Sequence, residues 1–163
     1  MKLIQYKEIS VRQNLCFFII IGTISFLADI YTGKNKLYNN CKEPYIALSL
    51  LYFHHIIASF VYFGWISQNR NILFLHLITI IIVILVQFNN ERRCPSTEIV
   101  NEKCNISRNN YLRDFLYFLR IKNFQRLSTQ DHTVHQHKYI NFYYIYIFFG
   151  FVISFVKIRK LQK

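Results

Sequence analysis

The sequence predicts an all-α integral membrane protein. We expect a bundle of four membrane-spanning helices, with an interfacial amphipathic helix in the long loop before the last span. The chain is 53% apolar and 18% aromatic but only 17% charged, and its apolar residues are collected in long blocks. It contains only 4 Gly and 2 Pro. A spanning helix needs about 20 mostly apolar residues. Because a domain typically holds about 100–200 residues, we expect residues 1–163 to form a single membrane domain.

The first span is predicted over residues 15–31. Its apolar block before Asp29 is short, about fourteen residues, which is also the length of a signal-peptide core. A cleaved signal peptide is therefore the alternative interpretation, with the three basic residues that precede the block as its basic region. We favour an uncleaved helix because apolar and aromatic residues continue into Ile30 and Tyr31.

Three further blocks predict the other spans. Residues 45–66 and 71–88 contain no Asp, Glu, Lys or Arg. The last span, residues 139–156, has tyrosines gathered at one end, and Lys157, Arg159 and Lys160 follow its other end. Aromatic rings at headgroup level and basic residues at a helix end are typical anchors of a membrane span.

Four spans place the two termini and the connector 67–70 on one side of the membrane. Their short segments are rich in Lys and Arg, which predicts that this side is cytoplasmic. The loop 89–138 then lies on the opposite side, where the tripeptide beginning at Asn105 is a glycosylation acceptor pattern. Cys41, Cys94 and Cys104 fall on that side too. They are expected to form one disulfide and leave one free thiol, or else to remain reduced.

The long loop 89–138 contains a predicted amphipathic helix at residues 110–127, with apolar residues at helical spacing and basic residues mainly off that face. Such a helix lies on anionic headgroups, although it could instead pack on the protein's own surface. The net charge of +12 is then explained by basic residues at the membrane edge. The expected partners are membrane lipids, other membrane proteins or a second copy of the chain. Nucleic acid is not expected, because no nucleic-acid-binding motif occurs.

Polar residues inside spans are costly and become candidates for function. His54 shares a face with small residues and is the better candidate to face protein, whereas the face of His55 looks less crowded. In the next span, His76, Thr79 and Gln87 form a polar stripe that should turn away from lipid and hydrogen-bond to neighbouring helices.

His54, His76 and Cys94 are the candidate metal ligands. The two histidines differ in depth by about 10 Å at 1.5 Å per residue, which argues against one ion shared between them. His132, His135 and His137 resemble a short metal-binding tract, but too few further ligands lie nearby to predict a zinc site. We therefore expect no cofactor.

No nucleophile elbow, zinc-protease motif or carboxylate pair occurs in the sequence. The leading hypothesis is accordingly a non-enzymatic membrane protein that acts through association with membrane proteins or lipids. One alternative is a thiol or metal redox protein that uses Cys94 together with Cys41 or Cys104. The second alternative is a small transporter whose path is lined by the polar stripe.

One pattern resembles a family of small, mostly bacterial multi-span membrane proteins known only as a domain of unknown function. Its members carry a His…Gly…His…Cys-Pro-Leu-Thr-x-x-Glu pattern, and the likeness covers about residues 45–104. The matching residues here are His54, Gly64, His76, Cys94, Pro95, Thr97 and Glu98. Ser96 stands in place of the family's Leu, and Glu98 directly follows Thr97. The resemblance implies a four-helix membrane fold in which His54, His76 and Cys94 are family positions, and it implies no activity.

Overall fold

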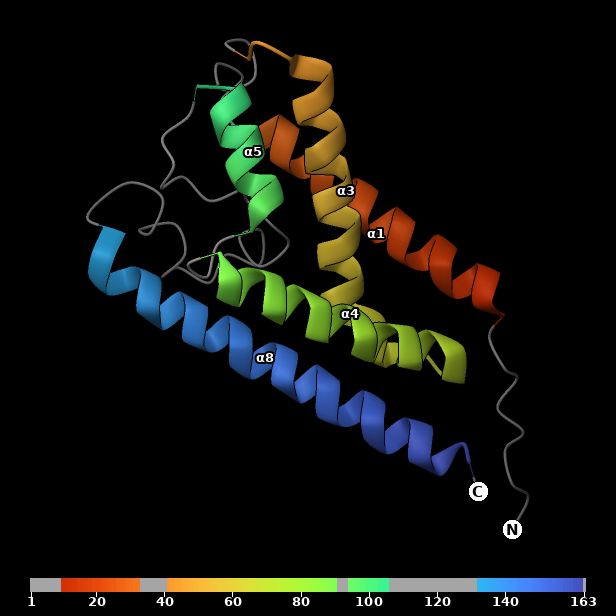
Figure 1. Cartoon of the computed structure of the whole chain (residues 1–163). Coiled ribbons are helices and arrows are strands. Elements are labelled where there is room, and N and C mark those ends of the chain that lie inside the picture. The colour runs from red at the N-terminus through yellow and green to blue at the C-terminus, as the bar shows by residue number, and fades with distance from the viewer. Residues whose placement is uncertain (1–9, 33–40, 91–93, 106–131, 163) are drawn as a thin grey trace.

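The computed structural model describes residues 10–32, 41–90, 94–105 and 132–162, and over these residues the regular structure is entirely helical. Figure 1 shows the arrangement of the helices. In chain order they are α1 (Val11–Thr32), α3 (Pro44–Phe63), the 3₁₀ turn η1 (Gly64–Ile66), α4 (Arg70–Asn89), α5 (Pro95–Lys103) and α8 (His132–Lys160).

Three stretches are long and apolar enough to cross a membrane, namely Val11–Tyr31, Pro44–Ile66 and Arg70–Asn89. They coincide with the first three predicted spans, so the length and apolar composition expected there are confirmed, and α8 is not among these stretches. The prediction for loop 89–138 needs correction, because α5 occupies part of it and α8 begins at His132. The amphipathic helix expected at 110–127 lies outside the described residues.

Local sequence explains where several helices begin. Pro44 and Pro95 open α3 and α5, where the fixed backbone angle of proline suits a first helical residue and its missing N–H costs nothing. Asn69 caps α4, and its side-chain oxygen accepts the backbone N–H groups of Asn71 and Ile72 at 3.0 and 3.3 Å.

The long helices pack as two pairs, α1 against α3 and α4 against α8, while α5 lies along the first half of α3 (Figure 1). The first pair approaches closely at Gly22, where an added Cβ would lie 2.8 Å from the Cα of Ile56. The second pair meets α3 in a small core of Val61, Ile80 and Ile147.

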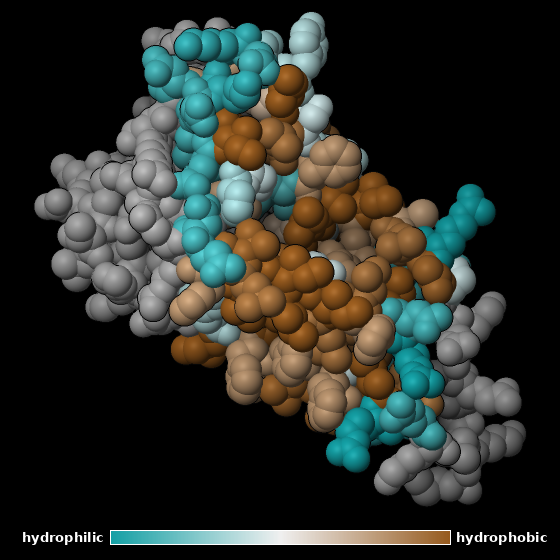
Figure 2. All heavy atoms as spheres, viewed as in Figure 1, coloured by the Kyte–Doolittle hydropathy of each residue, from teal (hydrophilic) through white to brown (hydrophobic). Residues whose placement is uncertain are grey.

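The molecule has two polar ends and an apolar middle. Figure 2 shows hydrophobic residues over the middle of the helices, with hydrophilic residues gathered over α5 and near the end of α8. Large apolar side chains such as Phe53, Phe74 and Phe148 are at least half exposed. An apolar surface of this extent would be a liability in water but suits contact with lipid.

The end of α8 is fixed to the α3–α4 connector. Lys157 Nζ donates to the carbonyls of Trp65, Ile66 and Ser67, at 2.9, 3.3 and 3.3 Å. The disulfide and α5 belong to the opposite end of α3 (Figure 1). The connector and the C-terminal end of the chain therefore lie together, as the predicted topology requires.

Candidate functional site

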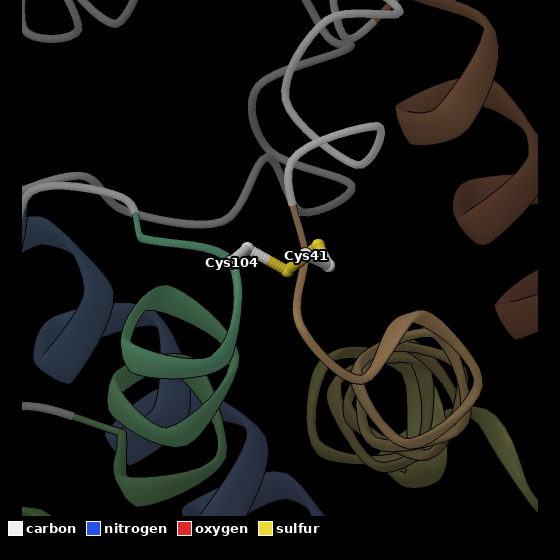
Figure 3. Close-up of a disulfide and its surroundings, with 2 residues drawn as sticks. All are labelled: Cys41 and Cys104. Carbon is white, nitrogen blue, oxygen red and sulfur yellow. A yellow bond between two sulfur atoms is a disulfide. The ribbon is translucent and has the colours of Figure 1, made fainter.

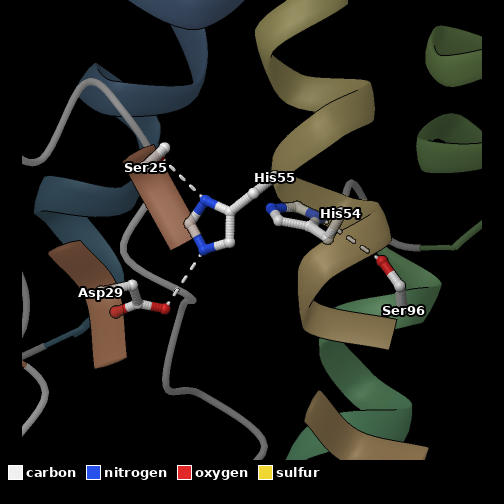
Figure 4. A network of polar contacts seen from close by, with 5 residues as sticks. All are labelled: Ser25, Asp29, His54, His55 and Ser96. Atoms are coloured by element: carbon white, nitrogen blue, oxygen red, sulfur yellow. Dashed lines mark hydrogen bonds and ion pairs between the residues drawn. The ribbon is translucent and has the colours of Figure 1, made fainter. Parts of the chain in front are cut away.

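The clearest chemical group in the structure is the thiol of Cys94, five residues beyond the end of α4. Cys94 is the residue before α5, with extended backbone angles. Its Sγ lies 3.4 Å from Nδ1 of His54 on α3 and 2.9 Å from Oγ of Ser96. Ser96 Oγ also lies 3.4 Å from the same ring nitrogen (Figure 4). A thiol, an imidazole and a hydroxyl thus meet where α5 begins.

This environment lowers the pKa of Cys94 from 9.0 to about 6. Burial acts in the opposite direction, since it disfavours the charged thiolate. The hydrogen bond and the charge of His54 outweigh it, helped by hydrogen bonds from Ser96 and from the backbone N–H of Thr97. That N–H belongs to the first turn of α5, where the orphan donors of a helix favour negative charge. At neutral pH the group is therefore mainly a thiolate, the nucleophilic form of cysteine.

Several contacts hold α5 along α3. Ala47 packs with Val100 and Cys104 in a small apolar core. The backbone N–H of Lys42 donates to the carbonyl of Lys103 at 2.9 Å, and the Lys103 ammonium pairs with the carboxylate of Glu43. At the other end of α5, Asn90 Nδ2 donates to the carboxylate of Glu98 at 2.7 Å.

A disulfide joins Cys41, just before α3, to Cys104, just after α5 (Figure 3). Cys94 and Cys16 are free cysteines. The alternative in which Cys94 pairs with Cys41 or Cys104 is therefore corrected. The reason is geometric, because nine residues of helix separate Cys94 from Cys104 and only Cys104 reaches the start of α3.

His55 is the most buried polar group of α3, and the expectation that its face is less crowded is wrong. The side chain is 1% exposed and lies between α3 and α1. Its Nδ1 is 2.9 Å from Ser25 Oγ, and its Nε2 is 3.3 Å from the carboxylate of Asp29 (Figure 4). These bonds use the side chains of Ser25 and Asp29 on α1 and tie α1 to α3.

His76 is also buried and hydrogen-bonded. Its Nδ1 lies 2.8 Å from Ser154 Oγ on α8, and its Nε2 lies 3.1 Å from the carbonyl oxygen of Val61. Gly64 leaves room for the ring, because an added Cβ would lie 2.3 Å from His76 Cδ2. His76 therefore joins three elements by packing and hydrogen bonds, and does not meet His54.

The rest of the polar stripe on α4 is hydrogen-bonded. Thr79 Oγ1 donates to the carbonyl of Leu75 in its own helix at 2.9 Å. Gln87 contacts two tyrosines of α8, since its Nε2 donates to Tyr143 Oη and its Oε1 accepts from Tyr144 Oη, both at 3.3 Å. Gln87 thus bonds to a neighbouring helix, as expected, whereas Thr79 bonds within its own.

Within the described parts of the chain, no group of three or more His, Cys, Asp and Glu side chains could hold a metal ion. His54 and Cys94 supply two donors, fewer than a zinc site uses. The backbone of His132, His135 and His137 lies in the first turns of α8, so this tract is not a loop. The contacts of those three side chains lie outside what the structure describes. Asn105 is exposed just past α5, and the next two residues of its acceptor pattern are outside the described range.

The pairing of His54 with Cys94 was not predicted from the sequence, although both residues were singled out. The usable signal is a short helix hidden in the loop, marked by Pro95 at its start, Glu98 in its first turn and Lys103 in its last turn. No family model matches the chain, and no curated protein or solved structure is detectably similar to it.

Proposed function

We propose that this chain is a four-span integral membrane protein whose Cys94 is a reactive thiol, held by α5 beside the middle of α3. One observation carries this proposal: Cys94 Sγ lies 3.4 Å from the imidazole of His54 and has a pKa of about 6. Free cysteines with no such partner have a pKa of about 8.5, and lowered values mark reactive or catalytic cysteines.

The fourth span is α8, over residues 139–156 as the sequence predicts. Its support comes from packing, because α8 runs beside α4, a helix that is itself long and apolar enough to span. Ile145, Phe148 and Phe149 are exposed apolar side chains on its outer surface. The bond from Lys157 to the connector sets the end of α8 level with the start of α4. The termini then face the cytoplasm, and Cys94 faces the opposite side.

The chemistry that fits this thiol best is thiol–disulfide exchange. The Cys94 thiolate attacks one sulfur of a substrate disulfide, a new S–S bond forms to that sulfur, and the other substrate sulfur leaves as a thiolate. The His54 imidazolium is placed to protonate the departing thiolate. Because Cys41 and Cys104 are bonded to each other at the far end of α5, a second thiol from another molecule must attack the mixed disulfide to regenerate Cys94.

The resemblance to the His…Gly…His…Cys-Pro family supports the same site. In the structure the motif residues form two contacts: His54 lies against Cys94, and Gly64 lies against His76. We infer that the first pair serves chemistry and the second serves helix packing. Action purely through association with membrane proteins or lipids stays a prediction.

The test is mixed-disulfide formation in the purified full-length protein. Incubation with oxidised glutathione at pH 6.5 should add one glutathione, located at Cys94 by peptide mass analysis. His54→Asn should react more slowly and Cys94→Ser not at all at this position, while Cys16 is the second free cysteine in the same sample. Equal reaction at Cys16 and Cys94 would exclude an activated thiol.

A further inference from the structure

A groove opens between η1 and the central part of α8. Its volume is about 260 Å³, and it is lined by Trp65, Ile145, Tyr146, Phe149, Gly150 and Ile153. Gly150 forms part of its floor, where an added Cβ would lie 3.1 Å from Trp65 Cδ1. The small residue therefore lets the indole ring lie close against α8.

The surface of this groove is carbon, even though two of its rings carry polar atoms. Trp65 Nε1 and Tyr146 Oη both donate to the carbonyl oxygen of Tyr62, at 2.8 and 3.0 Å. With those donors occupied, the rings present only apolar surface. The groove therefore selects an apolar ligand.

Positive charge lies directly beyond the groove. Lys157 follows Ile153 by one helical turn, about 6 Å along the axis. Its ammonium donates to three backbone carbonyls, and burial lowers its pKa, so it has no N–H left for an anionic ligand. Arg159 and Lys160 are exposed in the same last turn. A ligand that fits both features has an apolar chain and an anionic head.

We infer that this groove binds an acyl chain of an anionic membrane phospholipid, with the lipid phosphate at the exposed basic residues Arg159 and Lys160 of the last turn of α8. The inference rests on the proposed placement of α8 as the fourth span. The volume lies just below the range of about 300–1,000 Å³ for small-molecule pockets, which suits one segment of a chain. From Ile145 to Ile153 the groove extends about 12 Å along α8. Basic residues at the end of α8 face the leaflet whose surface carries anionic lipids, if the termini are cytoplasmic.

The test compares phosphatidylglycerol with phosphatidylcholine, added to the delipidated full-length protein in detergent and followed by native mass spectrometry. We expect tighter binding of phosphatidylglycerol. Lys160→Gln, which changes an exposed residue, should weaken phosphatidylglycerol binding about fivefold, the factor that corresponds to about 1 kcal/mol per basic residue near an anionic surface. It should leave phosphatidylcholine binding unchanged. Lys103→Gln, at the opposite end of the molecule, is the matched control and should change neither.

A second variant tests the groove itself. Ile145 is 62% exposed at its edge, so Ile145→Trp should fill the groove without disturbing the core and should weaken binding of both lipids. Equal affinity for the two lipids, or unchanged phosphatidylglycerol binding in either variant, would overturn the inference. Gln162→Cys tests its premise separately: labelling of that cysteine from the same side as Cys94 would show that α8 does not span. Neither the lipid-binding result nor the labelling result tests the reactivity of Cys94, which the glutathione experiment measures independently.

Discussion

The reactivity of Cys94 should depend on His54 more than on any other side chain. His54→Asn removes the imidazole charge and leaves an amide that still donates a hydrogen bond. The pKa of Cys94 is about 6 because His54 and the start of α5 outweigh the effect of burial. Without the imidazole, burial is opposed only by the hydrogen bonds that remain, and the pKa should rise toward its ordinary value of 9.0.

Two opposing effects determine how much His54→Asn lowers the reaction rate of Cys94 at pH 6. A thiol with a pKa of about 6 is half ionised there, and one with a pKa of 9 is about 0.1% ionised, a ratio of about 500. The thiolate of the lower pKa is, however, about 20-fold less nucleophilic at a Brønsted coefficient of about 0.4–0.5. The net expectation is a rate up to about 20-fold lower in His54→Asn at pH 6, and at most a few-fold lower at pH 7.

The assay is alkylation by iodoacetamide between pH 5 and 10, with the modified peptides quantified by mass spectrometry. The wild-type rate at Cys94 should rise with a midpoint near pH 6, and the midpoint of the variant should be shifted upward, toward 9. Cys16, an exposed free cysteine on α1, should give the same profile in both proteins and so checks the fold. A wild-type midpoint near 9, or an unchanged midpoint in His54→Asn, would refute the reasoning.

Three further outcomes concern stability, each measured by thermal or denaturant unfolding in detergent. Cys41→Ser opens a loop of 63 residues and should lower the free energy of unfolding by about 4 kcal/mol on the chain-entropy estimate; an unchanged value would mean the disulfide closes no constraint. Gly64→Ala places a Cβ 2.3 Å from a buried histidine ring and should cost about 1–3 kcal/mol or more. Gly150→Ala, with its nearest contact at 3.1 Å, should cost clearly less, and the reverse order would contradict the packing. His55→Leu removes two bonds between α1 and α3, about 1 kcal/mol in all at about 0.6 kcal/mol each, whereas Asp29→Asn keeps a polar partner and should cost less.

The sequence predicted three helices of membrane-spanning length well because length and apolar composition can be read along the chain alone. A helix must hold about 20 apolar residues in a row, and blocks such as 45–66 and 71–88 can be counted without knowing their neighbours. In a four-span topology the connector 67–70 lies at the end where α8 finishes, because spanning helices alternate in direction. Lys157 is bonded to that connector, which agrees with this topology.

The roles of the two neighbouring histidines could not be read from the sequence. Adjacent residues on a helix point about 100° apart, so periodicity assigns each to a different face but does not say what covers that face. Here α1 covers the face of His55 and α5 covers the face of His54. Small residues near His54 correctly indicated close packing, but Ser25 and Asp29, which bond to His55, come from a helix about thirty residues away.

The disulfide explains how Cys94 reaches His54 at all. Three cysteines allow three pairings, and sequence alone does not choose among them. Once α5 forms, however, Cys94 and Cys104 are held about 15 Å apart at 1.5 Å per residue. The bond from Cys104 to Cys41 anchors one end of α5 at the start of α3. From there α5 lies antiparallel to α3, so its first residue lies about ten residues along α3 from the start of that helix. The α3 residue at this level is His54. The disulfide is therefore a positioning element for the thiol, and reducing it should raise the midpoint of Cys94 alkylation as well as lower stability.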